Sequence, residues 1–209
     1  MSGEPTDSTQ IYLIDGGEPP WGDYGDILIH GMSAHLGRNA DGTIQLERTA
    51  PFIPPITFPG IDDIVVTSEM KAAMEAEGLR GVSFKPVDKT LIVDVPWHTW
   101  DLDAEDPPYY PEDGEPEGFI LDKPHSPELA EQLGEIWEVV LEDGAEMKRA
   151  EMNDDTTWDS HFYYVEGSWN GNDLFTVEEN RYMYASARAK LWFEENYPKW
   201  TSFKNGNRH

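Results

Sequence analysis

The 209-residue sequence contains no cysteine and few basic residues. The lack of cysteine excludes disulfides, thiolate metal sites and cysteine nucleophiles, so nothing in the chain requires an oxidising compartment. Only 15 lysines and arginines stand against 41 aspartates and glutamates, which gives a formal net charge of −26. Such a surface repels phosphate and anionic lipid. The composition therefore excludes nucleic-acid binding through phosphate neutralisation and favours a cationic partner.

The chain also lacks the long apolar runs of membrane spans and signal peptides. No stretch approaches the roughly 20 apolar residues that cross a bilayer, and the opening MSGEPTDSTQ has neither a basic nor an apolar region. We therefore expect a cytoplasmic protein. Hydrophobic residues make up 38% of the chain, which is enough for a core. We expect one folded domain over residues 10–204, between a flexible leader over 1–9 and a flexible tail over 205–209.

Local patterns predict an α+β fold with a mostly antiparallel sheet and about three helices. Short apolar segments predict strands at 10–14, 26–30 and 43–47. The four prolines of residues 51–60 predict a connector or an edge strand, because proline cannot donate a hydrogen bond to a sheet ladder.

The clearest predicted helix begins at Ser126 as N-cap, with Pro127 in the first helical position. Apolar residues then follow at helical spacing as far as Leu141. These residues are Leu129, Leu133, Ile136, Trp137, Val140 and Leu141.

The two other predicted helices belong to an internal pseudo-repeat of residues 63–84 and 181–203. Each copy has a strand, a serine N-cap, about ten helical residues and a returning strand that ends in Ser-Phe. In one copy the predicted cap is Ser68, the apolar residues five and six positions later are Ala73 and Met74, and the left-handed C-terminal residue is Gly78. The corresponding residues of the other copy are Ser186, Leu191, Trp192 and Asn196. A chance match between two copies of a common unit is the alternative.

No catalytic fingerprint is present: GxSxG, GxxxxGK[ST], GxGxxG and HExxH are all absent. His98 could act as a general base with Asp94 or Asp101 as its orienting carboxylate, although a surface histidine without a catalytic role is the simpler interpretation. Asp101, Asp103, Glu105 and Glu112 imitate the spacing of a calcium loop, but Asp106 replaces the glycine that its sixth position needs. We expect no enzyme, no metal and no cofactor; a carboxylate- or calcium-dependent hydrolase centred on residues 98–112 is the alternative.

The strongest candidate site is the segment from Trp97 to Asp122, which holds nine acidic residues and no lysine or arginine. Aromatic residues inside a charged rim are typical of binding hot spots. The alternative is a solvated acidic loop whose aromatic residues turn into the core. The residues predicted to bind a partner are Trp97, Trp100, Asp101, Asp103, Glu105, Asp106, Tyr109, Tyr110, Glu112 and Asp113.

Five segments carry a family resemblance: RTAPFIPPITFPGIDDIVVTSEMK (48–71), GVSFKPV (81–87), WHTWD (97–101), GEPEGFILDKPHSPELAEQLGEIWE (114–138) and WTSF (200–203). They resemble immunity proteins encoded beside polymorphic or type VI secreted toxins, and the strand-Ser-helix-strand unit ending in V-x-F-x-P-V resembles immunity domains of myxobacterial and proteobacterial toxin loci. The resemblance covers roughly residues 40–204 and implies a toxin inhibitor without catalytic residues.

The charge of the chain agrees with that resemblance, because opposite charge speeds the capture of a cationic enzyme. A nuclease with a basic active-site groove is the natural target. We therefore expect an immunity protein that neutralises a cognate secreted antibacterial toxin and contacts neither nucleic acid nor membrane directly. An acidic structural or adaptor protein is a further alternative.

Overall fold

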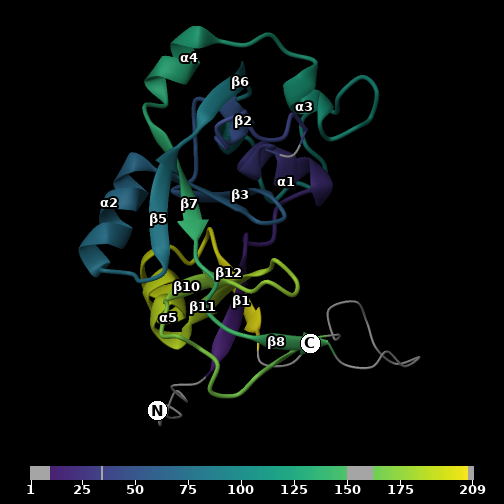
Figure 1. Cartoon of the computed structure of the whole chain (residues 1–209). Coiled ribbons are helices and arrows are strands. Elements are labelled where there is room, and N and C mark those ends of the chain that lie inside the picture. The colour runs from purple at the N-terminus through teal and green to yellow at the C-terminus, as the bar shows by residue number, and fades with distance from the viewer. Residues whose placement is uncertain (1–9, 34, 150–161, 207–209) are drawn as a thin grey trace. The chain divides into compact units, whose positions relative to one another are not determined.

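The structure is a computed structural model that describes residues 10–33, 35–149 and 162–206 and shows an α+β fold (Figure 1). Its strands pair mostly in the antiparallel direction, as predicted. The chain divides into two compact units: unit 1 contains 1–15, 74–83 and 140–209, and unit 2 contains 16–73 and 84–139. The single domain over 10–204 stays a prediction. The predicted leader, 1–9, and the last three residues of the predicted tail lie outside the described residues.

Unit 1 is built on a four-stranded sheet with the order β10-β11-β1-β12. Its first strand in the chain, β1, lies in the interior of the sheet and runs antiparallel to both β11 and β12. The strands are β1 (Ile11–Asp15), β10 (Leu174–Thr176), β11 (Met183–Ser186) and β12 (Ser202–Asn205). A second antiparallel pair consists of β8 (Met147–Arg149) and β9 (Phe162–Tyr164). Because β12 extends to Asn205, the predicted flexible tail begins too early.

The helix of unit 1 that connects β11 to β12 is α5 (Ala187–Asn196). The core of unit 1 joins the four-stranded sheet to the β8–β9 pair. The apolar side chains that fill the core are Ile11, Met147, Phe162, Phe175, Val177 and Tyr184.

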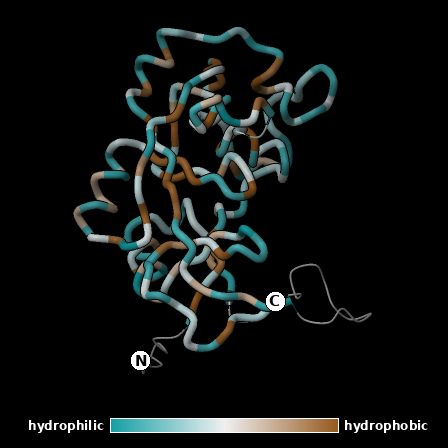
Figure 2. The backbone as a smooth tube through the Cα atoms, in the orientation of Figure 1, coloured by the Kyte–Doolittle hydropathy of each residue, from teal (hydrophilic) through white to brown (hydrophobic). Residues whose placement is uncertain are grey.

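Unit 2 contains most of a second four-stranded sheet, with the order β3-β4-β7-β5, and a parallel pair formed by β2 and β6. The strands are β2 (Gln45–Ala50), β3 (Ile56–Gly60), β4 (Asp63–Thr67), β5 (Val82–Pro86), β6 (Asp88–Asp94) and β7 (Ile136–Leu141). Figure 2 shows a run of hydrophobic residues along β7. One core cluster of unit 2 consists of Ile44, Leu46, Val65 and Ile136, and another of Ala50, Ile92 and Ala130.

The described residues form five α-helices and one 3-10 helix, more than the predicted three. The remaining helical elements are α1 (Asp23–His30), α2 (Ser68–Glu77), η1 (Trp97–Thr99), α3 (Gly118–Leu121) and α4 (Pro127–Gln132). None of the helices in the described ranges has the length and apolarity that a membrane crossing requires.

The strand predictions are confirmed at two of three positions. The prediction at 10–14 corresponds to β1 and that at 43–47 overlaps β2, while the proline-rich segment ends in β3, an edge strand. The strand predicted at 26–30 is wrong, because these residues belong to helix α1. Gly25, Leu28 and Ile29 form its buried face, and this short apolar run cannot by itself distinguish a helix from a strand.

The helix predicted from Ser126 begins where expected but is much shorter. The Ser126 hydroxyl accepts the Leu129 N–H (3.3 Å), with Pro127 in the first position. The helix ends at Gln132, and Gly134 follows in a left-handed conformation (φ 66°), which glycine adopts without steric cost. The apolar residues predicted to continue the helix therefore lie in β7 instead: Ile136, Trp137, Val140 and Leu141.

The pseudo-repeat is present in the topology. Each copy is a strand, a ten-residue helix and a returning strand: β4-α2-β5 and β11-α5-β12. In each sheet a third strand from a distant part of the chain lies between the two strands of the copy. This strand is β7 in the first sheet and β1 in the second.

The two copies match best when the N-caps are aligned at Thr67 and Ser186. The Thr67 hydroxyl accepts the Met70 N–H (3.2 Å), and the Ser186 hydroxyl accepts the Ala189 N–H (3.1 Å). The residues three and seven positions after the caps are all buried: Met70, Met74, Ala189 and Phe193.

Two predicted positions of the repeat, the cap at Ser68 and the left-handed residue at Asn196, are therefore wrong. Ser68 lies inside α2, one residue after the cap, and this shift moves Ala73 off the buried face. Leu191 is 46% exposed. Asn196 is the last residue of α5 and donates its side-chain amide to the Trp192 carbonyl, whereas Gly78 does adopt the left-handed conformation (φ 70°).

The two caps give a matched pair of stability predictions. Thr67→Ala should lower the free energy of unfolding by about 1 kcal/mol, because one N–H of the first helical turn loses its acceptor. Ser186→Ala should cost about 2 kcal/mol, since the Ser186 hydroxyl also donates to the buried Asp173 (3.0 Å). Urea unfolding of both variants measures the difference, and a smaller loss for Ser186→Ala than for Thr67→Ala would contradict it.

Candidate functional site

Residues 101–117, named here the acidic loop, connect η1 to α3 in unit 2 without regular secondary structure. All eight acidic side chains of the loop are exposed, and within the described ranges none of them pairs with a lysine or arginine. They include the six acids predicted to bind a partner: Asp101, Asp103, Glu105, Asp106, Glu112 and Asp113. Tyr109 and Tyr110 lie in the middle of the loop and are 44% and 46% exposed.

Two aromatic residues, Trp21 just before α1 and Tyr24 in its first turn, hold this loop. The Trp21 indole N–H donates to the Ala104 carbonyl (2.9 Å), and its ring lies 5.9 Å from that of Trp100. The Tyr24 hydroxyl donates to the Gly114 carbonyl (2.6 Å), and its ring meets that of Tyr110 edge-on at 4.9 Å. Sequence reasoning missed both residues, because they lie more than 80 residues before the loop positions that they contact.

The aromatic cluster continues into the core through Phe119 of α3. The Phe119 ring is buried and lies 6.0 Å from Trp100 and 5.5 Å from Tyr109. Trp100 is half-buried, so it packs inward on Phe119 and outward toward Trp21. The acidic loop is thus fixed to unit 2 by its aromatic side chains, while its carboxylates face solvent.

Trp97 does not belong to the exposed surface, which corrects the prediction that it binds a partner. Only 1% of Trp97 is exposed, and its indole N–H donates to the Thr49 hydroxyl of β2 (3.1 Å). Its ring packs against that of Phe52. The interpretation in which the aromatic residues turn into the core is therefore correct for Trp97, and Tyr109 and Tyr110 are the exposed aromatics of the loop.

Tyr110 and Tyr109 each interact with a charge at the surface. The Tyr110 hydroxyl donates a hydrogen bond to the Asp106 carboxylate, which raises the pKa of Tyr110 to about 12. The Lys123 ammonium lies 5.7 Å from the centre of the Tyr109 ring, within cation–π range. The surface therefore already accommodates one cation of the chain itself.

The arrangement expected of a hydrolase is not found around His98. The exposed imidazole stacks on the Phe52 ring (5.1 Å between centres, 28° between planes), and no hydrogen bond joins it to Asp94 or Asp101, which are both described. Among the residues that the structure describes, no three histidine or acidic side chains gather into a set that could hold a metal ion. The calcium-loop pattern of Asp101–Glu112 thus has no geometric counterpart.

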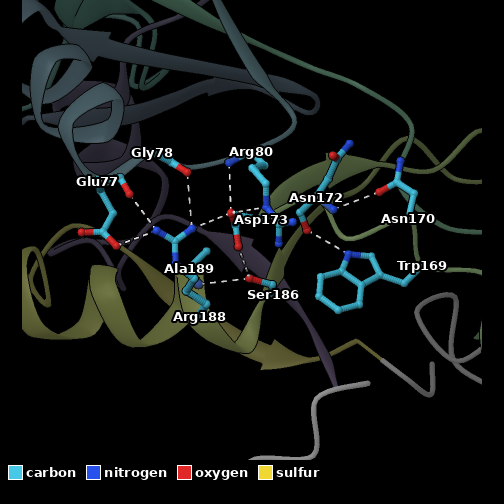
Figure 3. A network of polar contacts seen from close by, with 10 residues as sticks. All are labelled: Glu77, Gly78, Arg80, Trp169, Asn170, Asn172, Asp173, Ser186, Arg188 and Ala189. Carbon is cyan, nitrogen blue, oxygen red and sulfur yellow. Dashed lines mark hydrogen bonds and ion pairs between the residues drawn. The ribbon is translucent and has the colours of Figure 1, made fainter.

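A buried carboxylate outside the loop organises unit 1. Asp173 is 1% exposed, and Figure 3 shows donors converging on it from two segments, one at Arg80 and one at Ser186 and Arg188. One oxygen accepts from the Arg80 backbone (3.0 Å), the Arg80 Nε (3.3 Å) and the Arg188 Nη1 (2.7 Å); the other accepts from the Ser186 hydroxyl. Arg188 also binds the side chain and carbonyl of Glu77 at the end of α2.

This network links the end of α2, the start of α5 and the residue before β10. Both carboxylate oxygens of Asp173 accept hydrogen bonds from residues of unit 1, so the carboxylate stabilises this unit. Sequence reasoning missed it, because Asp173, Arg80 and Arg188 are far apart in the chain and the sequence contains many acids.

A second cluster in unit 2 pairs a half-exposed arginine with two buried acids. Arg38 donates to Asp63 (2.6 Å) and Glu138 (2.8 Å), and Asp63 also accepts from the Ser33 hydroxyl (2.6 Å). Burial acts to lower the pKa of Arg38, but the hydrogen bonds and charges of the two acids outweigh it and raise this pKa. The pairs keep the arginine charged and fix the segment around Arg38 to β4 and β7.

Among these sites, the acidic loop is the one whose charged groups face solvent without a partner of opposite charge within the described residues. Comparison of the chain with protein-family models and with curated proteins finds no match.

Proposed function

We propose that the chain is an immunity protein of the cytoplasm that binds a cognate cationic toxin through the acidic loop and thereby neutralises it. The observation that supports this most directly is the loop itself. It presents eight exposed carboxylates beside the exposed rings of Tyr109 and Tyr110. Solvent-facing like charges repel one another and lower stability, and a basic partner relieves that repulsion.

A nuclease is the proposed target, because its substrate groove must be basic to bind phosphates. Carboxylates on a fixed loop compete for the same lysines and arginines. The two tyrosines supply amphipathic contact area of the kind that dominates binding hot spots. Inhibition then needs no catalytic residue on this chain.

Charge reversal in the loop tests the proposal. The test variant carries four substitutions: Asp101→Lys, Asp103→Lys, Glu105→Lys and Asp106→Lys. It should associate about tenfold more slowly with the toxin encoded by the neighbouring gene at low ionic strength, because electrostatic steering is lost. Stopped-flow association over a range of salt concentrations measures the effect. The salt dependence should also become weaker.

A control variant separates the loop from the overall charge of the chain. Glu131, Glu135, Glu178 and Glu179 are exposed and lie outside the loop, so replacing all four by lysine changes the net charge by the same amount. This variant should keep most of the association rate. Equal slowing by both variants, or slowing by neither, would contradict a binding site at the acidic loop.

A further inference from the structure

We infer that α1 sets the shape of the acidic loop before any partner binds, with Trp21 and Tyr24 as positioning residues. This inference rests on the proposed function for its consequence in binding, but the contacts that carry it belong to the free protein. In this arrangement the carboxylates attract the partner, and the two aromatic residues hold the loop in the conformation that binds.

The two hydrogen bonds hold the loop at separated points. Trp21 binds the carbonyl of Ala104, and Tyr24 binds that of Gly114. The residues between these points include both exposed tyrosines. The segment that presents Tyr109 and Tyr110 is therefore fixed at both ends to a single helix start.

The helix that holds the loop is itself fixed to the strands of unit 2 by its last turn. The Thr49 hydroxyl donates to the Leu28 carbonyl (2.7 Å), and the wholly buried Arg48 donates to the Ile29 carbonyl (3.4 Å). The Phe58 N–H of β3 donates to the His30 Nδ1 (3.2 Å). A continuous series of contacts thus runs from β2 and β3 through α1 to the loop.

The backbone before α1 is unusual in a way that serves this contact. Trp21 has a positive φ of 60°, a conformation that is uncommon for a bulky residue and is often retained where function requires it. A Cβ at Gly25 would lie 1.7 Å from the Pro20 carbonyl oxygen, so only glycine allows the chain to fold back this closely on the helix. Both features place the Trp21 ring against Trp100.

A preset loop has a specific kinetic consequence. Ordering a mobile side chain on binding costs free energy, and a loop held in advance avoids this cost for several side chains. Variants that release the loop keep its charge, so they should keep the association rate and dissociate faster. Charge-reversed variants should do the opposite.

Hydrogen exchange of the free protein tests the positioning role without a partner. Tyr24→Phe removes the bond to Gly114 and keeps the ring, and we expect the amides of Asp103, Gly114 and Glu115 to exchange severalfold faster. Tyr163→Phe, at an exposed tyrosine of β9, should leave them unchanged. Trp21→Phe, which removes the bond to Ala104, is a second variant and should act in the same direction. Unchanged exchange in both Tyr24→Phe and Trp21→Phe would overturn the inference.

A nona-arginine peptide then serves as the cationic probe. Tyr24→Phe should raise its dissociation rate about threefold to tenfold with an unchanged salt dependence, as expected for a residue that acts through preorganisation. A slower association rate together with a changed salt dependence of binding would overturn the positioning role. If the charge-reversed loop binds the peptide as the native loop does, the proposed function fails instead, while the exchange result stands independently.

Discussion

Asp173→Asn should lower the free energy of unfolding by about 3 kcal/mol, since removing one partner of a buried ionic network leaves its other members uncompensated. The substitution keeps the size of the side chain but replaces one carboxylate oxygen by an amide group. Donors from Arg80, Arg188 and Ser186 converge on the carboxylate, and the amide can accept from only some of them. We place the effect at the lower end of such losses because both arginines are partly exposed.

Glu77→Gln provides the matched control for Asp173→Asn. Glu77 pairs with the same Arg188 but is partly exposed, and exposed ion pairs contribute only about 0.2–1 kcal/mol. Chemical unfolding monitored by tryptophan fluorescence measures both variants. Losses of similar size would show that the network does not depend on the buried carboxylate.

His30 should make the protein less stable in acid by about 2.5 kcal/mol between about pH 7 and pH 4.5. Burial, together with the nearby charge of Arg48, lowers the pKa of His30 from 6.5 to about 4. Below about pH 6.5 His30 is protonated in the unfolded chain, whereas in the folded chain it stays neutral down to about pH 4. The free energy of unfolding therefore falls as the pH drops through this window.

The geometry around His30 gives a physical reason why the folded protein keeps this side chain neutral. Its Nδ1 accepts the Phe58 N–H, and a protonated ring has no acceptor to offer. His30→Gln cannot titrate, so its stability should depend less on pH, whereas His98→Gln, at an exposed position, should behave as the native protein. Unfolding curves at both pH values distinguish them, and the same pH dependence in His30→Gln and the native protein would refute the prediction.

Local sequence signals were sufficient where backbone chemistry decides the structure. The N-caps near Ser126 and Ser186, the proline-rich edge strand and the strand-helix-strand units follow from hydrogen-bonding and steric rules that act over a few residues. The signals failed where tertiary packing decides. Residues 136–141 have apolar side chains that suit either period, and their place between β4 and β5 makes them a strand.

The charged residues of the candidate site were predictable from the sequence, but the residues that hold the acidic loop in place were not. The exposed acids and Tyr109 and Tyr110 are visible as a pattern in one segment. Trp97 was misplaced because its partner, Thr49, lies in a distant strand. Trp21 and Tyr24 contact the loop from more than 80 residues away, and no spacing rule in a single sequence connects such positions.

The interior position of β1 in the sheet of unit 1 also constrains how the protein is made. This strand precedes every other described element in the chain, but both of its neighbours, β11 and β12, lie within residues 183–205. The strand β1 therefore has neither of its two sheet neighbours until nearly all the described chain has been translated. The strands β3, β4, β5 and β7 are complete by residue 141, so we expect their sheet to assemble on the nascent chain while β1 is still waiting.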